Sequence, residues 1–284
     1  MTAPAPPPAA GHDRSPSASA PASPSSSSVP EPVPDGVADL ARAARSVTVL
    51  TGAGMSAESG VPTFRDAQTG LWARYDPEQL ATPQAWRRDR ELVWAWYAWR
   101  AALVRRVRPN AGHDALAQWA ALPNRRLTIA TQNVDDLHER AGSEVRAHVH
   151  GSLFAFRCER CAAPYDTDAI ELPDPDDPPP RREPPACPRC QHPVRPGVVW
   201  FGEALPEREF AAATDACRDT DLVLVVGTSG IVYPFAALPG VAARHGVPVV
   251  EINPVDTALT PDVDHAWRAT AANALPALVA ALRV

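Results

Sequence analysis

The chain has 284 residues, 45% of them hydrophobic, which suffices for one substantial core and a smaller satellite domain. It carries 27 basic and 33 acidic residues, a net charge of -6, and so lacks the basic footprint needed to bind nucleic acid or an anionic membrane surface. Its apolar runs are shorter than the roughly 20 residues that span a bilayer, and its opening segment lacks a secretory signal pattern. We therefore expect a cytoplasmic protein without nucleic-acid or membrane partners.

The first 34 residues are almost entirely Pro, Ala and Ser, so we expect a disordered tail with too few large apolar side chains to offset the entropy of ordering. Residues 37–45 then predict a short helix, and the apolar run at 46–51 is typical of a strand buried on both faces. Similar runs recur at 126–131, 222–226 and 247–252, with room for helices between them. This rhythm predicts an α/β fold with a Rossmann-like, doubly wound parallel sheet.

The middle of the chain interrupts this rhythm. Residues 158–196 contain four cysteines and an acidic, proline-rich tract at 171–180 that is incompatible with a helix or a central strand. We expect a separate small lobe at 151–196, a main domain made of 35–150 and 197–284, and a helical insertion in the main domain at about 62–110.

A glycine-rich loop follows the first predicted strand. Gly52, Gly54 and Ala57, with Ala53 between them, satisfy the Gly-x-Gly-x-x-Gly/Ala spacing of a dinucleotide-binding loop. Small residues let the backbone approach a pyrophosphate, and the following helix directs its N–H groups at it. A glycine-rich turn without a ligand is the alternative. Residues 61–72 are too polar and turn-rich for the second strand of an ordinary dehydrogenase, so hydride transfer is disfavoured.

Four of the five cysteines form two Cys-x-x-Cys pairs, Cys158 with Cys161 and Cys187 with Cys190. Two such pairs deliver four thiolates to a tetrahedral zinc ion, and an all-cysteine site is structural because no position remains for water. Two disulfides are the alternative, and a zinc ribbon that binds nucleic acid is disfavoured by the acidic insert. The fifth cysteine, Cys217, is predicted to be a small buried apolar residue on a helix and not a nucleophile.

Several short blocks, in a fixed order, resemble those of a known family. They are residues 52–65 (GAGMSAESGVPTFR), 131–135 (TQNVD), His150-Gly151, the two Cys-x-x-Cys pairs, 227–229 (GTS) and Asn253-Pro254. Over residues 37–284 the chain resembles the sirtuins. The resemblance implies cleavage of the nicotinamide–ribose bond of NAD and transfer of a lysine's acyl group to ADP-ribose, giving nicotinamide, 2'-O-acyl-ADP-ribose and free lysine.

By this resemblance His150 and Asn133 are catalytic, and His150 is the base. An imidazole suits that task because its pKa lies near neutrality. His148 would share a strand face with His150, and only the following glycine separates the two. Gln132, Asn133 and Asp135 follow a predicted parallel strand, where open α/β sheets place their ligand crevice. The resemblance implies that the two amides hold ribose hydroxyls and a water, and that Asp135 holds the nicotinamide carboxamide, although Asn133 and Asp135 would also suit a helix cap.

The resemblance implies further contacts to NAD. Arg65 would meet the phosphate on the nicotinamide side, and Phe64 would shield the anomeric carbon from water. The expected contacts to the adenosine half are Gly227, Thr228, Ser229, Asn253, Pro254 and the backbone near Ala271. Residues 269–272 (ATAA) lack the glycine usual at that last position.

The predicted helix at 90–104 places Tyr97 and Arg100 three residues apart, on one face. A phenol beside a guanidinium grips a carboxylate well, and this pair resembles the one by which a sirtuin class recognises succinyl-, malonyl- or glutaryl-lysine. An aromatic core stripe with Arg100 reaching solvent is the alternative. The segment 198–203 resembles the family's strand-like segment that pairs with an extended acyl-lysine peptide. The residues expected to contact the peptide there are Val198, Trp200, Phe201 and Gly202.

The expected function is therefore NAD-dependent removal of acyl groups from protein lysines. Desuccinylase and demalonylase activity is the favoured interpretation, with glutaryl and acetyl groups as further substrates. A plain deacetylase, a mono-ADP-ribosyltransferase or an NAD hydrolase would use the same crevice. A non-catalytic NAD or ADP-ribose sensor is the alternative of another class, against which the intact His150 and Asn133 argue.

Overall fold

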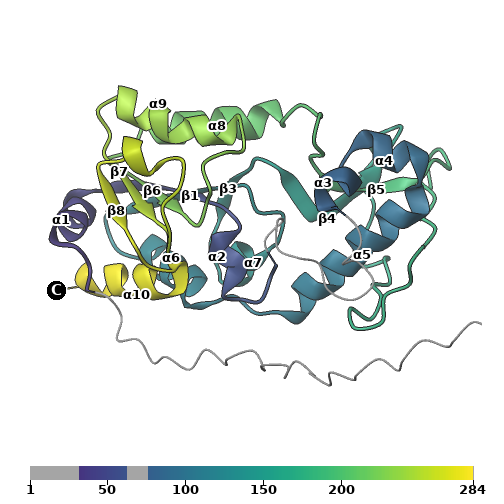
Figure 1. The fold of residues 1–284 in the computed structure, drawn as a ribbon, viewed down its shortest axis with the longest axis horizontal. Coiled ribbons are helices and arrows are strands. Elements are labelled where there is room, and N and C mark those ends of the chain that lie inside the picture. The colour runs from purple at the N-terminus through teal and green to yellow at the C-terminus, as the bar shows by residue number, and fades with distance from the viewer. Residues whose placement is uncertain (1–31, 63–75, 284) are drawn as a thin grey trace, which may run out of the picture.

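The structure, a computed structural model, describes residues 32–62 and 76–283. Its centre is a sheet of six parallel strands in the order β3-β2-β1-β6-β7-β8 (Figure 1). The strands of this sheet are β1 (Ser46–Thr51), β2 (Arg126–Thr131), β3 (Val145–His148), β6 (Leu222–Val226), β7 (Val249–Ile252) and β8 (His265–Trp267). The strand order reverses between β1 and β6, and open sheets of this kind bind ligands at the reversal point. The predicted Rossmann-like sheet is confirmed.

Helices cover both faces of this sheet (Figure 1). The helices α1 (Asp35–Ala43), α6 (Ala111–Ala120) and α10 (Ala271–Ala281) pack on one face, and α8 (Glu207–Arg218) and α9 (Leu238–Arg244) pack on the other. Shorter helical segments lie in the connections: α2 (Gly54–Ala57), α7 (Leu137–Arg140) and the 3-10 turns Phe235–Ala237 and Thr260–Asp262.

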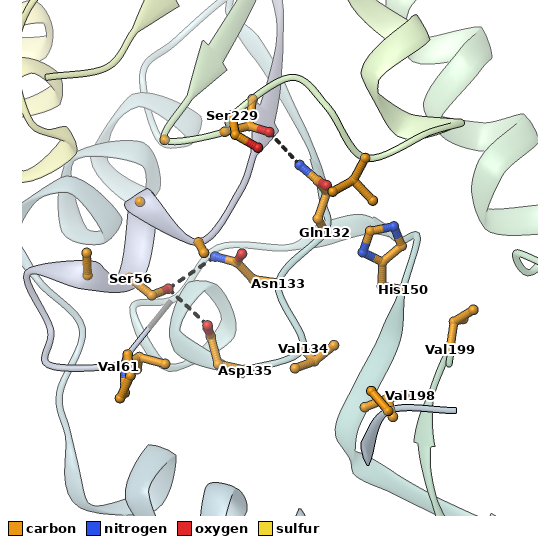
Figure 2. A pocket seen from close by; sticks show the side chains of 18 of the residues that line it. Ser56, Val61, Gln132, Asn133, Val134, Asp135, His150, Val198, Val199 and Ser229 are labelled. Carbon is orange, nitrogen blue, oxygen red and sulfur yellow. Dashed lines mark hydrogen bonds between the residues drawn. The ribbon is translucent and has the colours of Figure 1, made fainter. Parts of the chain in front are cut away.

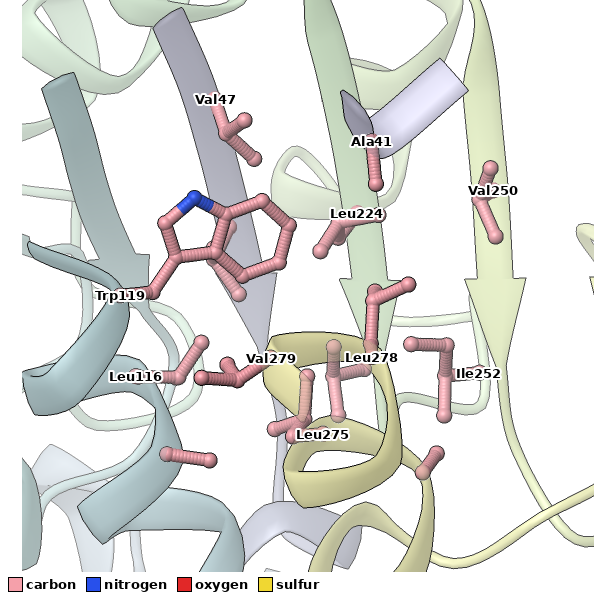
Figure 3. Packing of buried hydrophobic residues seen from close by; sticks show 14 of the residues in the cluster. Ala41, Val47, Leu116, Trp119, Leu224, Val250, Ile252, Leu275, Leu278 and Val279 are labelled. Atoms are coloured by element: carbon pink, nitrogen blue, oxygen red, sulfur yellow. The ribbon is translucent and has the colours of Figure 1, made fainter. Parts of the chain in front are cut away.

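The continuous apolar runs of the sequence arise because successive strand residues enter two different cores. In β6, Leu222 and Leu224 join the core formed with α1, α6 and α10, whereas Val223 and Val225 join the core formed with α8 and α9. Figure 3 shows the first of these cores, where Trp119 of α6 lies over the sheet together with side chains of α10. Because both faces of β6 are buried, its sequence does not alternate between apolar and polar residues.

The observed boundaries differ slightly from the predicted ones. The predicted strand at 247–252 begins at Val249, because Pro248 has no N–H to donate to the ladder. The first helix begins at Asp35 rather than at residue 37 and ends at Ala43.

A second, smaller assembly lies beside the sheet edge and includes the insertion helices. It contains α3 (Pro77–Leu80), α4 (Pro83–Arg88), α5 (Arg90–Arg106) and the antiparallel pair β4 (Gly151–Cys158) and β5 (Val194–Val198), around a core of its own. The proline-rich tract at 171–180 forms neither helix nor strand, as predicted. It packs along α5, where Trp99 Nε1 donates to the Pro175 carbonyl at 3.0 Å. The exact division of the chain at residues 150 and 197 stays a prediction.

Within residues 32–62 and 76–283, no helix has both the length and the apolar character required to cross a membrane.

Candidate active site

A cavity of about 1080 Å³ lies at the sheet edge where β1, β2, β6 and β7 end, between that edge and helix α5. This volume lies just above the range of about 300 to 1,000 Å³ that is usual for small-molecule sites. The residues singled out from the sequence that line the cavity are Ala53, Gly54, Ala57, Tyr97, Arg100, Gln132, Asn133, Asp135, His150, Val198, Trp200, Phe201, Gly202, Gly227, Thr228, Ser229, Asn253, Pro254 and Ala271. Gly52 lies behind this lining, whereas Phe64 and Arg65 fall outside the described residues.

The glycines of the loop after β1 are needed for contact with the loop after β6. A Cβ atom at Gly52 would lie 2.8 Å from the Gly227 carbonyl oxygen, and one at Gly54 would lie 2.7 Å from Gly227 Cα. Gly227 has φ +63°, and its own Cβ would lie 2.4 Å from the Met55 nitrogen. The two loops therefore touch through backbone atoms at the reversal point of the sheet. From the sequence, these glycines were expected only to let the backbone approach a pyrophosphate. The contact between the two loops was not predicted.

Asn133 is held by hydrogen bonds on the side facing β1 (Figure 2). Its Nδ2 donates to the Gly52 carbonyl at 3.0 Å and to Ser56 Oγ at 3.2 Å, while Ser56 Oγ donates to Asp135 Oδ2 at 2.9 Å. Both donor hydrogens of the Asn133 amide are thus used, and Oδ1 remains as an acceptor. The backbone N–H of Asn133 donates to Thr131 Oγ1 at 2.9 Å, which fixes the start of the loop.

Asp135 is 6% exposed, and burial raises its pKa, although hydrogen bonds from the Leu137 N–H and Ser56 oppose the shift. Its Oδ1 accepts the Leu137 N–H at 3.1 Å, at the start of α7. The N-cap residue of α7 is Asp136, so neither Asn133 nor Asp135 is the cap, although Asp135 bonds the first N–H of the helix and also lines the cavity.

The structure separates the two candidate histidines. His150 lies in the turn between β3 and β4 and lines the cavity; burial lowers its pKa, and the backbone carbonyl of Gln132 opposes that shift. His148 points elsewhere, since its Nε2 lies 2.6 Å from Glu139 Oε1. Burial lowers the pKa of His148, but the Glu139 carboxylate outweighs this and leaves the pKa raised. The two rings therefore do not share a face, because β3 ends at His148.

The wall beneath β6 and β7 is built by amide groups. Gln132 Nε2 donates to Thr228 Oγ1 at 2.8 Å, and Asn253 Nδ2 donates to the Thr228 carbonyl at 3.0 Å. These two bonds connect the ends of β2, β6 and β7 across the crevice, and Figure 2 shows the one made by Gln132. Farther along the wall, the N–H of Ala272 in the first turn of α10 donates to Glu58 Oε2 at 2.9 Å, which places Ala271 against the loop after β1.

Tyr97 and Arg100 enter the cavity from α5. Tyr97 is 4% exposed, and burial raises the pKa of its phenol. Burial lowers the pKa of Arg100, while Tyr97 and the Asp135 carboxylate oppose the shift. The Arg100 guanidinium carbon lies 5.2 Å from the centre of the Trp96 ring. The aromatic stripe of α5 does belong to the core, as the alternative held, but Arg100 lines the cavity.

The segment after β5 differs from the predicted strand-like run at 198–203. The strand ends at Val198, and Val199 N–H donates to the His150 carbonyl at 2.8 Å, while Phe201 N–H donates to the Ala81 carbonyl at 2.9 Å. Gly202 follows with φ +88°. The chain turns here because these N–H groups bond to other parts of the fold, and the turn aims Trp200 at Tyr97.

The four paired cysteines converge at one end of the small assembly. All four are free, their Sγ atoms lie within 4.8 Å of one another, and the closest pairs are 3.4, 3.6 and 3.7 Å apart. Disulfide sulfurs would be about 2.05 Å apart, whereas four sulfurs around a tetrahedral zinc with bonds of about 2.3 Å are separated by about 3.8 Å. The geometry fits a structural zinc ion held by Cys158, Cys161, Cys187 and Cys190.

Sequence reasoning missed Ser56, which connects Asn133 to Asp135. The available signal was a hydroxyl side chain within residues 52–57, which otherwise contain only glycine, alanine and methionine. Its two partners are 77 and 79 residues away along the chain, so no local pattern indicates them.

The sheet order, the crevice at the reversal point and the four-cysteine cluster define a dinucleotide-binding α/β protein with a metal-stabilised accessory lobe. The Sir2 family model matches residues 52–234, and the chain belongs to that family, the sirtuins. The resemblance noted in the sequence is thereby confirmed.

Named relatives and solved structures agree with this assignment. The chain is 52% identical over 247 residues to NAD-dependent protein deacylase 2 of Corynebacterium efficiens, covering 86% of this chain and 96% of the relative. It is also 52% identical over 233 residues to an NAD-dependent protein deacylase of Mycobacterium tuberculosis, covering 82% and 96%. A crystal structure of a Sir2 homologue complexed with NAD superposes with a TM-score of 0.80 at 42% identity, covering 88% of this chain and 94% of the other.

Proposed function

We propose that this chain removes acidic acyl groups, succinyl and malonyl foremost, from protein lysines in an NAD-dependent reaction. NAD-dependent protein deacylation follows from Sir2 family membership and from relatives bearing that name at about half identity. The acidic preference is supported by one observation: Tyr97 and Arg100 line the same cavity as His150 and Asn133. A guanidinium with a phenol beside it compensates the charge of a carboxylate in a buried site.

The residues around the cavity suit the steps of such a reaction. NAD supplies the ADP-ribosyl group that takes up the acyl group. His150 accepts the proton of a ribose hydroxyl, since burial keeps its imidazole neutral. Asn133, held by Gly52 and Ser56, offers Oδ1 to a hydroxyl or a water, and Asp135 accepts from the nicotinamide carboxamide.

The remaining wall residues suit the other half of NAD. The touching glycine loops after β1 and β6 would receive the pyrophosphate, and the region of Thr228, Ser229, Asn253, Pro254 and Ala271 would receive the adenosine. Arg65 and Phe64 are proposed as contacts on the nicotinamide side from the sequence resemblance alone. Val198, Trp200, Phe201 and Gly202 border the same cavity and would contact the acyl-lysine peptide.

The test incubates the full chain with NAD and matched peptides carrying succinyl-, malonyl- or acetyl-lysine, with products identified by mass spectrometry. We expect 2'-O-succinyl-ADP-ribose and free lysine, and kcat/KM at least tenfold higher for the succinyl than for the acetyl peptide. In Arg100→Met, the succinyl preference should disappear because the carboxylate loses its charged partner. Faster turnover of the acetyl peptide by the wild type would contradict the acidic preference. NAD consumption without an acyl-lysine peptide would instead indicate an NAD hydrolase.

A further inference from the structure

Trp200 lies directly against Tyr97 although the two residues are 103 positions apart in the chain. The indole Nε1 donates to the phenolic oxygen of Tyr97 at 3.0 Å, and the two ring centres are 6.4 Å apart. Trp200 is 2% exposed and Tyr97 is 4% exposed, so water has little access to this bond. Both residues line the cavity.

The direction of this hydrogen bond determines what the phenol can do next. An indole N–H can only donate, so the Tyr97 oxygen is the acceptor, and its own proton must point to another partner. Among the described residues, none accepts a hydrogen bond from that hydroxyl. Burial raises the pKa of Tyr97, so the hydroxyl keeps its proton at neutral pH. Accepting the indole N–H also polarises the O–H bond and makes it a stronger donor.

Trp200 is itself held by the chain around it. The Arg195 guanidinium carbon lies 3.5 Å from the centre of the Trp200 ring, and two nitrogens of Arg195 reach the Glu203 carboxylate at 2.6 and 2.9 Å. Glu203 Oε2 also accepts the backbone N–H of Trp200 at 2.9 Å. The ring of Trp86 also packs against Trp200, with ring centres 5.6 Å apart. The indole therefore has little freedom to turn away from Tyr97.

We propose that Trp200 is a positioning residue for acyl selectivity: its indole N–H occupies the acceptor site of the Tyr97 hydroxyl and thereby commits the phenolic proton to the carboxylate of an acidic acyl group. The inference rests on the proposed function, because it assumes that Tyr97 meets that carboxylate. An ionised carboxylate only accepts hydrogen bonds. It therefore suits a phenol whose oxygen already accepts the indole N–H and whose O–H is left to donate. The methyl end of an acetyl group has no acceptor there and gains nothing from it.

The test measures the ratio of kcat/KM for the succinyl peptide to kcat/KM for the matched acetyl peptide. Using a ratio cancels any effect of Trp200 on the peptide backbone, which both substrates share. Trp200→Phe keeps an aromatic ring under Arg195 and removes the N–H; we expect the ratio to fall about three- to tenfold, the range for loss of one hydrogen bond. Tyr97→Phe should also lower the ratio, and Trp200→Phe should add no further fall in that background.

Trp86→Phe is the matched control. It removes an indole N–H from a ring that packs against Trp200, but that N–H donates to Glu159 Oε2 at 2.6 Å and not to Tyr97. Its ratio should stay at the wild-type value, within about twofold. If Trp200→Phe does not fold, 3-benzothienylalanine at position 200, which replaces N–H by sulphur in a ring of the same shape, gives the same test.

The outcomes separate the two proposals. If wild type prefers the succinyl peptide but Trp200→Phe leaves the ratio unchanged, or lowers it equally with and without the Tyr97 hydroxyl, the role of Trp200 is overturned and the acidic preference stands. If wild type turns over the acetyl peptide and not the succinyl peptide, the proposed acyl preference is overturned and this inference falls with it.

Discussion

At the scale of single residues, the two histidines near the end of β3 differ in the sign of their pKa shifts. Burial lowers the pKa of His150, whereas the carboxylate of Glu139 overcomes burial and raises the pKa of His148. A catalytic base works in its deprotonated form, so activity is lost as pH falls through the pKa of that base. The pH dependence of turnover therefore identifies which ring acts.

We expect the acidic limb of kcat/KM to have its midpoint below pH 6.5, the usual pKa of histidine, because the lowered pKa of His150 keeps the base form available at lower pH. The measurement is kcat/KM for an acyl peptide at saturating NAD between pH 5 and 8. His148→Gln should leave the midpoint in place. A midpoint above 6.5 that disappears in His148→Gln would assign the base to His148.

The sequence allowed site residues to be paired correctly where residues close in the chain are also close in space. The i, i+3 spacing of Tyr97 and Arg100 on a helix is such a case, and both do line one cavity. Contacts between distant segments were not readable. Trp200 was predicted as a peptide contact, and its hydrogen bond to Tyr97 depends on how β5 ends, which is decided by backbone bonds to His150 and Ala81.

At the scale of elements, strands and helices were predicted from the spacing of apolar residues along the chain. Strands buried on both faces, such as β6, leave an unbroken apolar run, which is identified as a strand by its short length and its β-branched residues. The residues after Val198 have the same apolar composition, yet they turn, because local composition does not reveal which N–H groups find partners elsewhere. The helix expected after the glycine loop is likewise only four residues long.

The small assembly should depend on zinc, because β4 and β5 form only a two-stranded sheet, which is marginal alone. Cys187→Ser removes one of four thiolates at a buried position. We expect loss of bound zinc and a fall in Tm of more than about 10 °C, since structural zinc contributes on the order of 10 kcal/mol in small zinc peptides and each 1 kcal/mol shifts Tm by about 2 to 4 °C in a domain of this size. Zinc content by mass spectrometry and thermal unfolding measure both effects.

Cys217→Ala is the control for this change. Cys217 is fully buried on α8, outside the four-cysteine cluster, so its truncation costs packing energy without removing a ligand. Zinc content should stay at one ion per chain. Retention of zinc by Cys187→Ser would contradict a four-thiolate site.

At the scale of the whole molecule, the cavity is lined by the six-stranded sheet domain on one side and by the small assembly on the other. A ligand in the cavity therefore contacts both. The reversal of strand order creates the crevice, the touching loops after β1 and β6 set its depth, and α5 with the turn after β5 closes the other side. The strand order could be expected from the fold class. The loop contact could not, because it depends on the left-handed conformation of Gly227, which sequence spacing does not encode.

Gly227→Ala tests whether this loop contact is needed to bind the dinucleotide. A ligand present at 100 times its Kd stabilises the fold by about 2.7 kcal/mol, which raises Tm by roughly 5 to 10 °C in a domain of this size. We expect wild type to show such a rise with NAD, measured by differential scanning fluorimetry. The new Cβ would lie 2.4 Å from the Met55 nitrogen, so the variant must separate the two loops and should lose the rise.

Gly246→Ala separates this clash from backbone strain. Gly246 also has a positive φ, +74°, but a Cβ there meets nothing within 4 Å. Both variants therefore carry the cost of an alanine in the left-handed region, about 1 kcal/mol, and both should unfold at a lower temperature without ligand. Only Gly227→Ala should lose the NAD-induced rise, because only its methyl group forces apart the walls of the crevice. An equal NAD response in the two variants would mean that the loop contact stabilises the sheet and has no part in binding NAD.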